Sequence, residues 1–391
     1  MATPTNSQGH AQLPPPTNIQ MVDLKTQYLA MQDEVDQAVL DVIRSGAFIN
    51  GPAVRSFQAS LEAYLGAGHV IPCANGTDAL QIALMALGLE PGDEVIVPAF
   101  TYVASAEVIA LLQLSPVMVD VDPRTFNVRA EDIAPAITAK TKAIIPVHLY
   151  GQSCDMAPIM ELARAHNLYV VEDNAQAIGA RYTLPDGEVR ATGTIGHIGC
   201  TSFYPSKNLG AYGDGGAINT DDEALAKTLT MVANHGQSRR YYHDVVGCNS
   251  RLDSIQAAIL NCKLPRLDAY CARRQQAAAY YDAHLQDLPG LLTPARQANS
   301  THVFHQYTLR IDGDRRDALQ QHLQAAGVPT MIYYPVALYD QEAFRGTAAN
   351  AVTFLPNTDL LTREVISLPM HSEMDEDTLA YIVGAIRSFF A

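Results

Sequence analysis

Lys207 is the residue of this chain best placed to do chemistry. It lies in residues 200–210 (CTSFYPSKNLG), after an apolar strand-like run and before a glycine-rich segment, residues 210–216. The chain has six lysines, and Lys207 alone sits among small and turn-forming residues after such a run. Burial lowers the pKa of an ammonium group, so the free amine could form an imine with an aldehyde. A surface lysine in a turn would show the same local pattern.

Residues 74–78 (ANGTD) could bind an anion. They precede a helix-like apolar run, so Gly76 and Thr77 fall in the first turn of the predicted helix. Free N–H groups and a hydroxyl at a helix N-terminus suit a phosphate. An ordinary Asn cap without a ligand explains the same residues equally well.

Residues 169–173 (YVVED) read as a strand that ends in two carboxylates. Neighbouring strand residues point to opposite faces, so Glu172 and Asp173 cannot both face one ligand. An Asp at the carboxyl end of a strand can pair with a protonated ring nitrogen and keep both groups charged. The alternative is that Asp173 caps the next helix.

Tyr102 follows another predicted strand, residues 95–97, and could stack on a flat heteroaromatic ring. A core position is the commoner role of such an aromatic. Together, a phosphate cradle, a stacking ring, an anion for a ring nitrogen and an amine form the set that pyridoxal phosphate (PLP) requires.

The elements that must position these residues follow a strand–loop–helix pattern from about residue 69 to 220. Short, β-branched apolar runs alternate with helical stretches such as residues 155–166, which predicts a parallel sheet covered on both faces. Ligands of such α/β folds bind beyond the carboxyl ends of the strands. Residues 210–216 do not match the dinucleotide fingerprint and are interpreted as a turn.

A length of 391 residues predicts two domains. Residues 1–18 are polar and Pro-rich and read as a disordered tail, not as a secretion signal. We assign residues 19–265 to a large cofactor-binding domain and residues 266–391 to a smaller α+β domain. A long helix over residues 251–286 is expected to join them.

The composition narrows the choice of partners. A formal net charge of -15 argues against nucleic acid or an anionic membrane as partner, because both repel an acidic surface. The sequence has no apolar run of 18 residues, so we predict no membrane span. The six cysteines lack zinc-type spacing, so we expect free thiols in a reducing cytoplasm and no structural metal.

From about Ile19 to the C-terminus, these motifs in this order resemble the DegT/DnrJ/EryC1/StrS sugar aminotransferases. Those are PLP enzymes of the aspartate aminotransferase fold (fold type I). The resemblance implies that Lys207 holds PLP covalently and transfers the proton, that Asp173 pairs with the pyridine nitrogen, and that Gln176 lies beside the ring phenol oxygen. The remaining implied contacts are Gly76, Thr77 and Ser202 with the phosphate, and Tyr102 stacked on the ring.

The resemblance also implies a homodimer with shared active sites. Asn249 matches a residue donated across the dimer interface to the neighbour's phosphate, and Arg251 matches a basic residue reaching the neighbour's substrate. One departure is Asn174, where Ala or Cys is usual; it is tolerated if its side chain points away from the ring. A branch of the family that carries His at the imine position performs dehydration, so Lys207 favours the transaminase.

Residues 235–243 and 249–258 resemble members that aminate C-3 of a nucleotide-linked ketosugar. The resemblance is closest to enzymes acting on UDP-2-acetamido-2-deoxy-3-oxo-glucuronate, with L-glutamate as amino donor, for surface polysaccharide synthesis. It implies that Arg239, Arg240 and Arg251 contact diphosphate or carboxylate oxygens, which guanidinium forks bind in pairs. A solvated basic loop is the other interpretation of Arg239 and Arg240.

Tyr333 is taken as a further substrate contact, although members of that subgroup can carry His in this segment. The difference leaves a dTDP-linked 3-oxo-6-deoxyhexose as the next candidate substrate. Two other functions stay open, a PLP-dependent sugar dehydratase and a sugar-nucleotide sensor without turnover. Retention of Lys207, Asp173 and Gln176 together speaks against the sensor.

Overall fold

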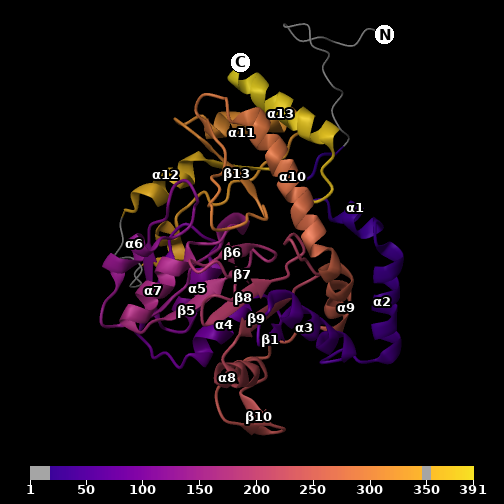
Figure 1. The fold of residues 1–391 in the computed structure, drawn as a ribbon, viewed down its shortest axis with the longest axis vertical. Coiled ribbons are helices and arrows are strands. Elements are labelled where there is room, and N and C mark those ends of the chain that lie inside the picture. The colour runs from indigo at the N-terminus through magenta and orange to yellow at the C-terminus, as the bar shows by residue number, and fades with distance from the viewer. Residues whose placement is uncertain (1–17, 346–353) are drawn as a thin grey trace.

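The computed structural model describes residues 18–345 and 354–391 (Figure 1). The tail predicted at residues 1–18 therefore lies outside the described residues, apart from Asn18. None of the helices in these two ranges has the length and apolar content needed to cross a bilayer. Within the same ranges, no three His, Cys, Asp or Glu side chains are arranged to hold a metal ion, and all six cysteines have free thiols.

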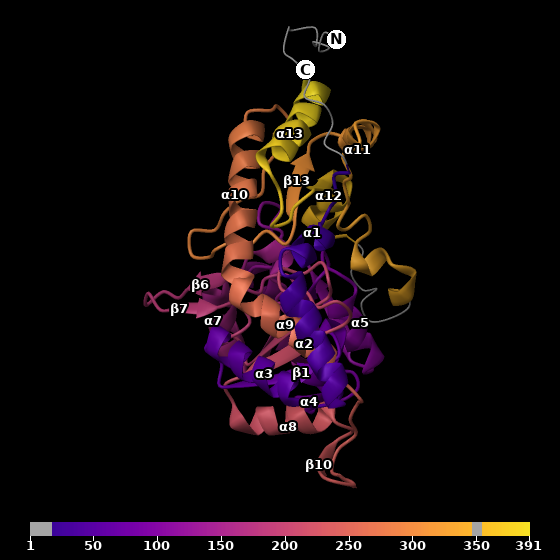
Figure 2. The ribbon, with the colours of Figure 1, turned by 90° about the vertical axis from the view of Figure 1, so that its right-hand side faces the viewer.

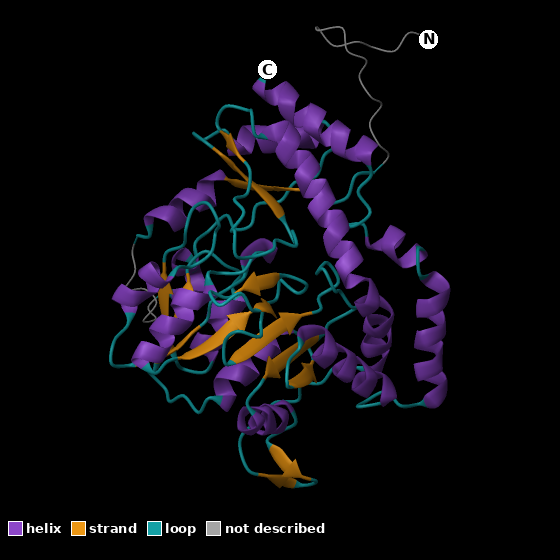
Figure 3. Ribbon diagram, in the orientation of Figure 1, coloured by secondary structure: helices purple, strands orange, loops and turns teal. Residues whose placement is uncertain are grey.

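A seven-stranded sheet with the order β1-β9-β8-β5-β4-β2-β3 lies at the centre of the larger part of the molecule (Figures 1 and 3). Neighbouring strands from β8 to β3 run parallel, whereas β9 is antiparallel to both β1 and β8. The mostly parallel α/β sheet predicted from the sequence is therefore confirmed. The strands are β1 His69–Cys73, β2 Glu94–Pro98, β3 Ser115–Val119, β4 Thr141–Ile144, β5 Tyr169–Asp173, β8 Ile198–Ser202 and β9 Gly216–Thr220.

Helices cover both faces of this sheet, and successive strand side chains point into the two cores in turn. Val171 and Ile218 pack in the core on the face of α4, α5 and α8. Val170 and Ala217 lie in cores on the opposite face, with α7 and with α3 and α9 respectively. The helices are α3 Pro52–Leu65, α4 Gly76–Ala86, α5 Ala104–Leu111, α6 Ala130–Ile133, α7 Met156–His166, α8 Glu223–Ala233 and α9 Ser254–Lys263.

Two N-terminal helices and two hairpins extend from this body (Figure 2). Val35 of α2 packs against Ile259 of α9, so the N-terminal segment lies along α9. The hairpins β6–β7 and β10–β11 each consist of two antiparallel strands. The bounds are α1 Leu24–Leu29, α2 Gln32–Ser45, β6 Arg181–Thr183, β7 Val189–Ala191, β10 Gln237–Arg239 and β11 Tyr242–His243.

The C-terminal part has its own three-stranded antiparallel sheet, β12-β13-β14, with a core that includes Leu309, Ile366 and Ile382. Leu338 and Phe344, however, pack in the core of the large sheet. The domain boundary at residues 265 and 266 therefore stays a prediction. The elements are α10 Leu267–Leu285, β12 Leu291–Leu292, β13 Tyr307–Ile311, α11 Arg316–Ala325, α12 Pro356–Glu364, β14 Val365–Leu368 and α13 Glu376–Phe390.

The prediction of a single helix over residues 251–286 is wrong. The chain forms α9 and then α10, separated by a 3₁₀ turn at Leu264–Arg266. Pro265 lies in this turn and has no N–H to donate to a preceding carbonyl, so a straight α-helix cannot continue through it. α10 then runs from the large sheet to the C-terminal part (Figures 1 and 2).

Candidate active site

A pocket of about 630 Å³ opens at the carboxyl ends of the parallel strands. Asp173 ends β5 and Ser202 ends β8, and these strands are neighbours with Asp173 opposite Cys200. The fold thus brings together residues that are more than 250 positions apart in the sequence. The predicted residues that line the pocket are Gly76, Thr77, Tyr102, Asp173, Gln176, Ser202, Lys207 and Tyr333.

Lys207 lies in the turn after β8, where its N–H donates to the carbonyl of Tyr204 at 2.8 Å. The side chain is half-buried, and within the described residues its amine makes no hydrogen bond or ion pair. Burial lowers the pKa of Lys207 to about 8, against the opposing effect of the Asp173 charge. A substantial fraction of the amine is therefore neutral near pH 7 to 8 and able to act as a nucleophile or base.

Asp173 is 5% exposed and is fixed by two donors. The Ser105 hydroxyl donates to Oδ2 at 2.7 Å, and the Ala175 N–H donates to Oδ1 at 3.1 Å. Ser105 comes from α5, and Thr101 lies 3.3 Å from its oxygen. No sequence pattern points to Ser105, because it is a small residue inside an apolar helix, 68 positions from Asp173.

Glu172 points to the other face of the sheet, as strand alternation predicts. Its carboxylate lies 2.7 Å from His148 Nε2 and accepts N–H groups from Gly193, Ile195 and Gly196. Burial alone would raise the pKa of Glu172, but His148 and these backbone donors together hold it below its usual value. This buried carboxylate bonds the end of β5 to residues 193–196 on the face of the sheet away from the pocket, and it does not line the pocket.

The start of α4 packs against the end of β8 and lines one part of the pocket, here called the Gly76 cradle. Asn75 caps the helix by accepting the Asp78 N–H at 2.8 Å, so the cap considered as an alternative is present as well. A Cβ on Gly76 would lie 2.6 Å from the Cβ of Ser202, which leaves room for backbone only. N–H groups and the Thr77 and Ser202 hydroxyls meet here, and such a donor set fits a phosphate.

Adding a methyl group at Gly76 is expected to close this cradle. In Gly76→Ala, the new Cβ forces α4 and β8 apart, so we expect PLP affinity to fall by more than about tenfold and the free energy of unfolding by about 1–3 kcal/mol. Fluorescence titration with PLP and thermal unfolding measure the two effects. The matched control is Gly384→Ala in α13, where an added Cβ meets nothing within 4 Å. Unchanged PLP affinity in Gly76→Ala would contradict the cradle.

The open side of the pocket is lined by aromatic rings. Tyr102 is 56% exposed, and its ring centroid lies 6.2 Å from that of Tyr334. The Gln176 amide nitrogen donates to the Tyr334 hydroxyl at 3.2 Å, and its carbonyl oxygen accepts the Tyr150 N–H at 2.7 Å. Gln176 therefore joins the strand-end loops of the large sheet to the segment that carries Tyr333.

The C-terminal part contributes His305, Gln306 and Tyr334 to the pocket, and sequence reasoning missed all three. Burial, with Lys207 and Arg274 adding to it, lowers the pKa of His305 well below its ordinary value, so this ring is neutral at pH 7. No local pattern marks these residues, because they reach the pocket only through the packing of the C-terminal part on the sheet.

The predicted residues Asn249, Arg251, Arg239 and Arg240 do not line the pocket of the described chain. Asn249 pairs with Asn234 in an isolated bridge. Arg239 and Arg240 lie exposed on the β10–β11 hairpin, with the Arg239 guanidinium 3.7 Å from the centroid of the Tyr242 ring.

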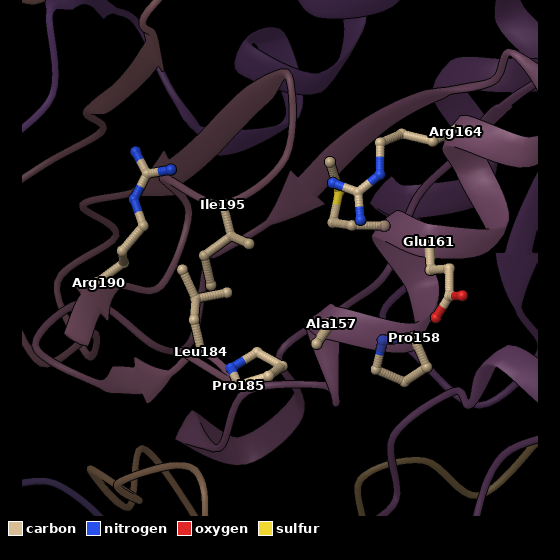
Figure 4. Close-up of a pocket in the computed structure, with 9 residues that line it drawn as sticks. Ala157, Pro158, Glu161, Arg164, Leu184, Pro185, Arg190 and Ile195 are labelled. Atoms are coloured by element: carbon tan, nitrogen blue, oxygen red, sulfur yellow. The ribbon is translucent and has the colours of Figure 1, made fainter. Parts of the chain in front are cut away.

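Asn174, the departure noted in the sequence, also lies outside the pocket. Its side-chain nitrogen donates to the Thr201 hydroxyl at 3.3 Å, so it points away from Lys207 and Asp173 into the protein. A second hollow of about 430 Å³ lies between α7 and the β6–β7 hairpin, with Arg164 and Arg190 at its edge (Figure 4). It contains none of the predicted site residues.

Comparison with known proteins gives a consistent result. The sequence profile of the DegT/DnrJ/EryC1/StrS aminotransferase family matches residues 30–387. The chain is 46% identical over 370 residues to the UDP-2-acetamido-2-deoxy-3-oxo-D-glucuronate aminotransferase of Pseudomonas aeruginosa, covering 95% of this chain and 100% of the relative. It is 45% identical over 371 residues to a UDP-N-acetyl-3-dehydro-alpha-D-glucosamine 3-aminotransferase of Acidithiobacillus ferrooxidans, covering 95% and 98%.

Among solved structures, S. venezuelae DesV in complex with a ketimine intermediate superposes with a TM-score of 0.90. That protein is 39% identical to this chain, and the match covers 96% of this chain and 99% of DesV.

Proposed function

The chain belongs to the DegT/DnrJ/EryC1/StrS aminotransferase family, whose members use PLP on a type I fold. From this membership and the site, we propose the donor and the acceptor of the amino group. The amino group moves from L-glutamate to C-3 of a nucleotide-linked 3-oxo sugar, first of all UDP-2-acetamido-2-deoxy-3-oxo-glucuronate. The observation that carries this proposal is the half-buried Lys207 amine, with its lowered pKa, in one pocket with Asp173 and the Gly76 cradle. The choice of sugar rests on the named activities of two relatives, which both act on UDP-linked 3-oxo sugars. We place the reaction in the cytoplasm, where it feeds surface polysaccharide synthesis.

The pocket residues fit PLP in both chemistry and arrangement. Bound PLP supplies an electron sink for negative charge that develops at the substrate carbon. Asp173, oriented by Ser105, would keep a proton on the pyridine nitrogen by charge attraction. The start of α4 and the Ser202 hydroxyl would hold the phosphate, Tyr102 would contact the ring, and Gln176 would lie on the side of the phenol oxygen; all of them line the pocket.

Lys207 holds the cofactor and moves the proton. Its pKa of about 8 leaves the amine able both to take up and to return a proton near neutral pH. A positioned base of this kind accelerates proton transfer by about 10²–10⁴-fold.

We further propose that the active site is completed by a second copy of the chain. The substrate and glutamate carry phosphate and carboxylate groups, yet in the described residues Lys207 is the one cation that lines the pocket. Arg251 lies outside the pocket, two residues before Asp253, which pairs with Ile49 in an isolated bridge. Phe48 and Ile49 are 47% and 51% exposed. An apolar surface beside an unused arginine suits an interface across which Arg251 and Asn249 reach the partner's pocket.

Complementation between two inactive variants tests this dimer. Lys207→Ala removes the amine from its own pocket, whereas Arg251→Ala removes a cation from the partner's pocket. If the two variants are unfolded together and refolded in equal amounts, half of the dimers hold one intact site, so about a quarter of wild-type activity should return. Each variant refolded alone is the control. No recovery in mixtures that contain mixed dimers by native mass spectrometry would refute the shared site.

The substrate is tested by product analysis. Purified enzyme, PLP and L-glutamate are mixed with UDP- or dTDP-linked 3-oxo sugars, and mass spectrometry looks for exchange of the oxo group for an amine. Aminated UDP-glucuronate derivative is the expected product, with parallel double-reciprocal plots because the two half-reactions alternate. Preference for the dTDP-linked 6-deoxyhexose would reassign the sugar. A deoxygenated product formed without glutamate would identify a dehydratase. A protein that stays colourless with added PLP and shows no turnover would favour the sensor.

A further inference from the structure

Lys263 is a buried amine that the reaction does not use. It lies at the end of α9 and is 1% exposed, and its Nζ donates to the carbonyl of Gly210 at 2.6 Å. The same nitrogen lies 4.9 Å from the ring centroid of Tyr212. Within residues 18–345 and 354–391 it has no carboxylate partner. A buried ammonium without a counter-charge is costly, and apolar side chains often replace buried charges at no loss of stability. Packing alone therefore does not explain an amine here.

Gln256 holds the same loop from one end of α9. Its side-chain oxygen accepts the Tyr212 N–H at 2.9 Å, and its nitrogen donates to the Tyr212 carbonyl at 3.5 Å. Gln256 and Lys263 are seven residues apart, which places them on one face of the helix, two turns from each other. A Cβ on Gly213 would lie 2.8 Å from the Gln256 nitrogen, so backbone and helix are in close contact.

The loop held in this way is the continuation of the Lys207 turn. Near Lys207 the turn is closed by two backbone hydrogen bonds, from Lys207 N–H to the Tyr204 carbonyl and from Ala211 N–H to the Phe203 carbonyl, each 2.8 Å. The Asn208 side-chain nitrogen adds two bonds, to the carbonyl of Val303 at 2.9 Å and to the sulfur of Cys271 at 3.8 Å. Beyond Asn208, the side chains that fix the loop at Gly210 and Tyr212 are those of α9.

We propose that Lys263 and Gln256, together called the α9 clasp, are positioning residues that hold the loop after Lys207 so that its amine stays shielded within the pocket. The inference rests on Lys207 being the reactive amine of the proposed function. Loss of the clasp frees the loop, exposes the half-buried amine to more water and removes part of the desolvation that makes it a good nucleophile. The effect would act on Lys207 and leave the contacts of the nucleotide sugar in place.

The clasp is tested first on the protein without PLP. Competitive labelling with acetic anhydride over a pH series, followed by peptide mass spectrometry, gives the pKa of the Lys207 amine. We expect this pKa to rise by about 1 unit in both Lys263→Met and Gln256→Leu, because the amine becomes more hydrated. Lys227→Met is the matched control: Lys227 is exposed on α8, where it pairs with Glu223 at 2.8 Å.

The second measurement uses the PLP-loaded enzyme. We expect kcat to fall about tenfold in both clasp variants, with the KM for the nucleotide sugar unchanged, because the clasp acts on the base and not on substrate contacts. An unchanged pKa of Lys207 in both variants overturns the proposal, even if the Tm falls. A pKa rise in Lys263→Met alone overturns it as well, because the effect then comes from the lost charge. If Lys263→Met does not fold, Gln256→Leu decides.

The result of the labelling experiment does not depend on whether the proposed function is correct. Labelling reports the pKa of Lys207 whether or not PLP binds there. Absence of a covalent bond between the protein and PLP would refute the proposed function. The labelling result would still show whether α9 controls the environment of the Lys207 amine.

Discussion

Lys207→Ala is expected to lower kcat/KM for amino transfer by about 10⁴-fold or more, because one side chain supplies both the covalent attachment and the base. The amine is half-buried and is the one cation lining the described pocket, so no neighbouring group can replace it. Activity is measured as 2-oxoglutarate formed from glutamate in the presence of the 3-oxo sugar. The variant should still bind PLP through the Gly76 cradle, only reversibly.

Two controls make the Lys207 result specific. Lys227→Ala alters an exposed lysine of α8 and should keep full activity. Borohydride reduction followed by peptide mapping should place a stable PLP label on Lys207 in the unaltered protein and on no peptide of the variant. A label on Lys263, a buried lysine whose pKa burial also lowers to about 8, would contradict the assignment.

Asp173→Asn is expected to lower kcat by about 10²–10³-fold, the usual effect of losing one preorganised electrostatic contact. The amide keeps the shape of the side chain but no longer stabilises a proton on the pyridine nitrogen, so the ring becomes a weaker electron sink. Stopped-flow kinetics of the glutamate half-reaction, which is followed by absorbance, measure this step without the sugar substrate.

The control for Asp173→Asn is Asp287→Asn, an exposed carboxylate paired with Arg387 far along the chain in the C-terminal part. It should keep full activity. Ser105→Ala should show a smaller loss of kcat than Asp173→Asn, because the carboxylate stays charged and loses only the donor 2.7 Å away that orients it. Equal rates for Asp173→Asn and the unaltered protein would show that the ring nitrogen needs no anion.

Local patterns predicted the elements that carry the central residues. The strand expected at residues 169–173 is β5, and the helix expected at residues 155–166 is α7 with one residue fewer. β2 covers Glu94–Pro98 and so extends one residue beyond each end of the strand expected at residues 95–97. Hydrophobic periodicity finds such elements well, whereas their ends depend on hydrogen bonds to neighbours that the sequence does not show.

The sequence by itself determined the chemistry of this protein: an amine in a turn after a strand, a carboxylate at a strand end and a helix start with Gly76 and Thr77. Each is a local feature, so its residues and spacing are visible in one short segment. Only the tertiary structure decided that Ser105, His305, Gln306 and Tyr334 share the pocket and that α9 fixes the loop after Lys207. These contacts join segments far apart in the chain, and packing of the whole fold, not local propensity, sets which of them meet.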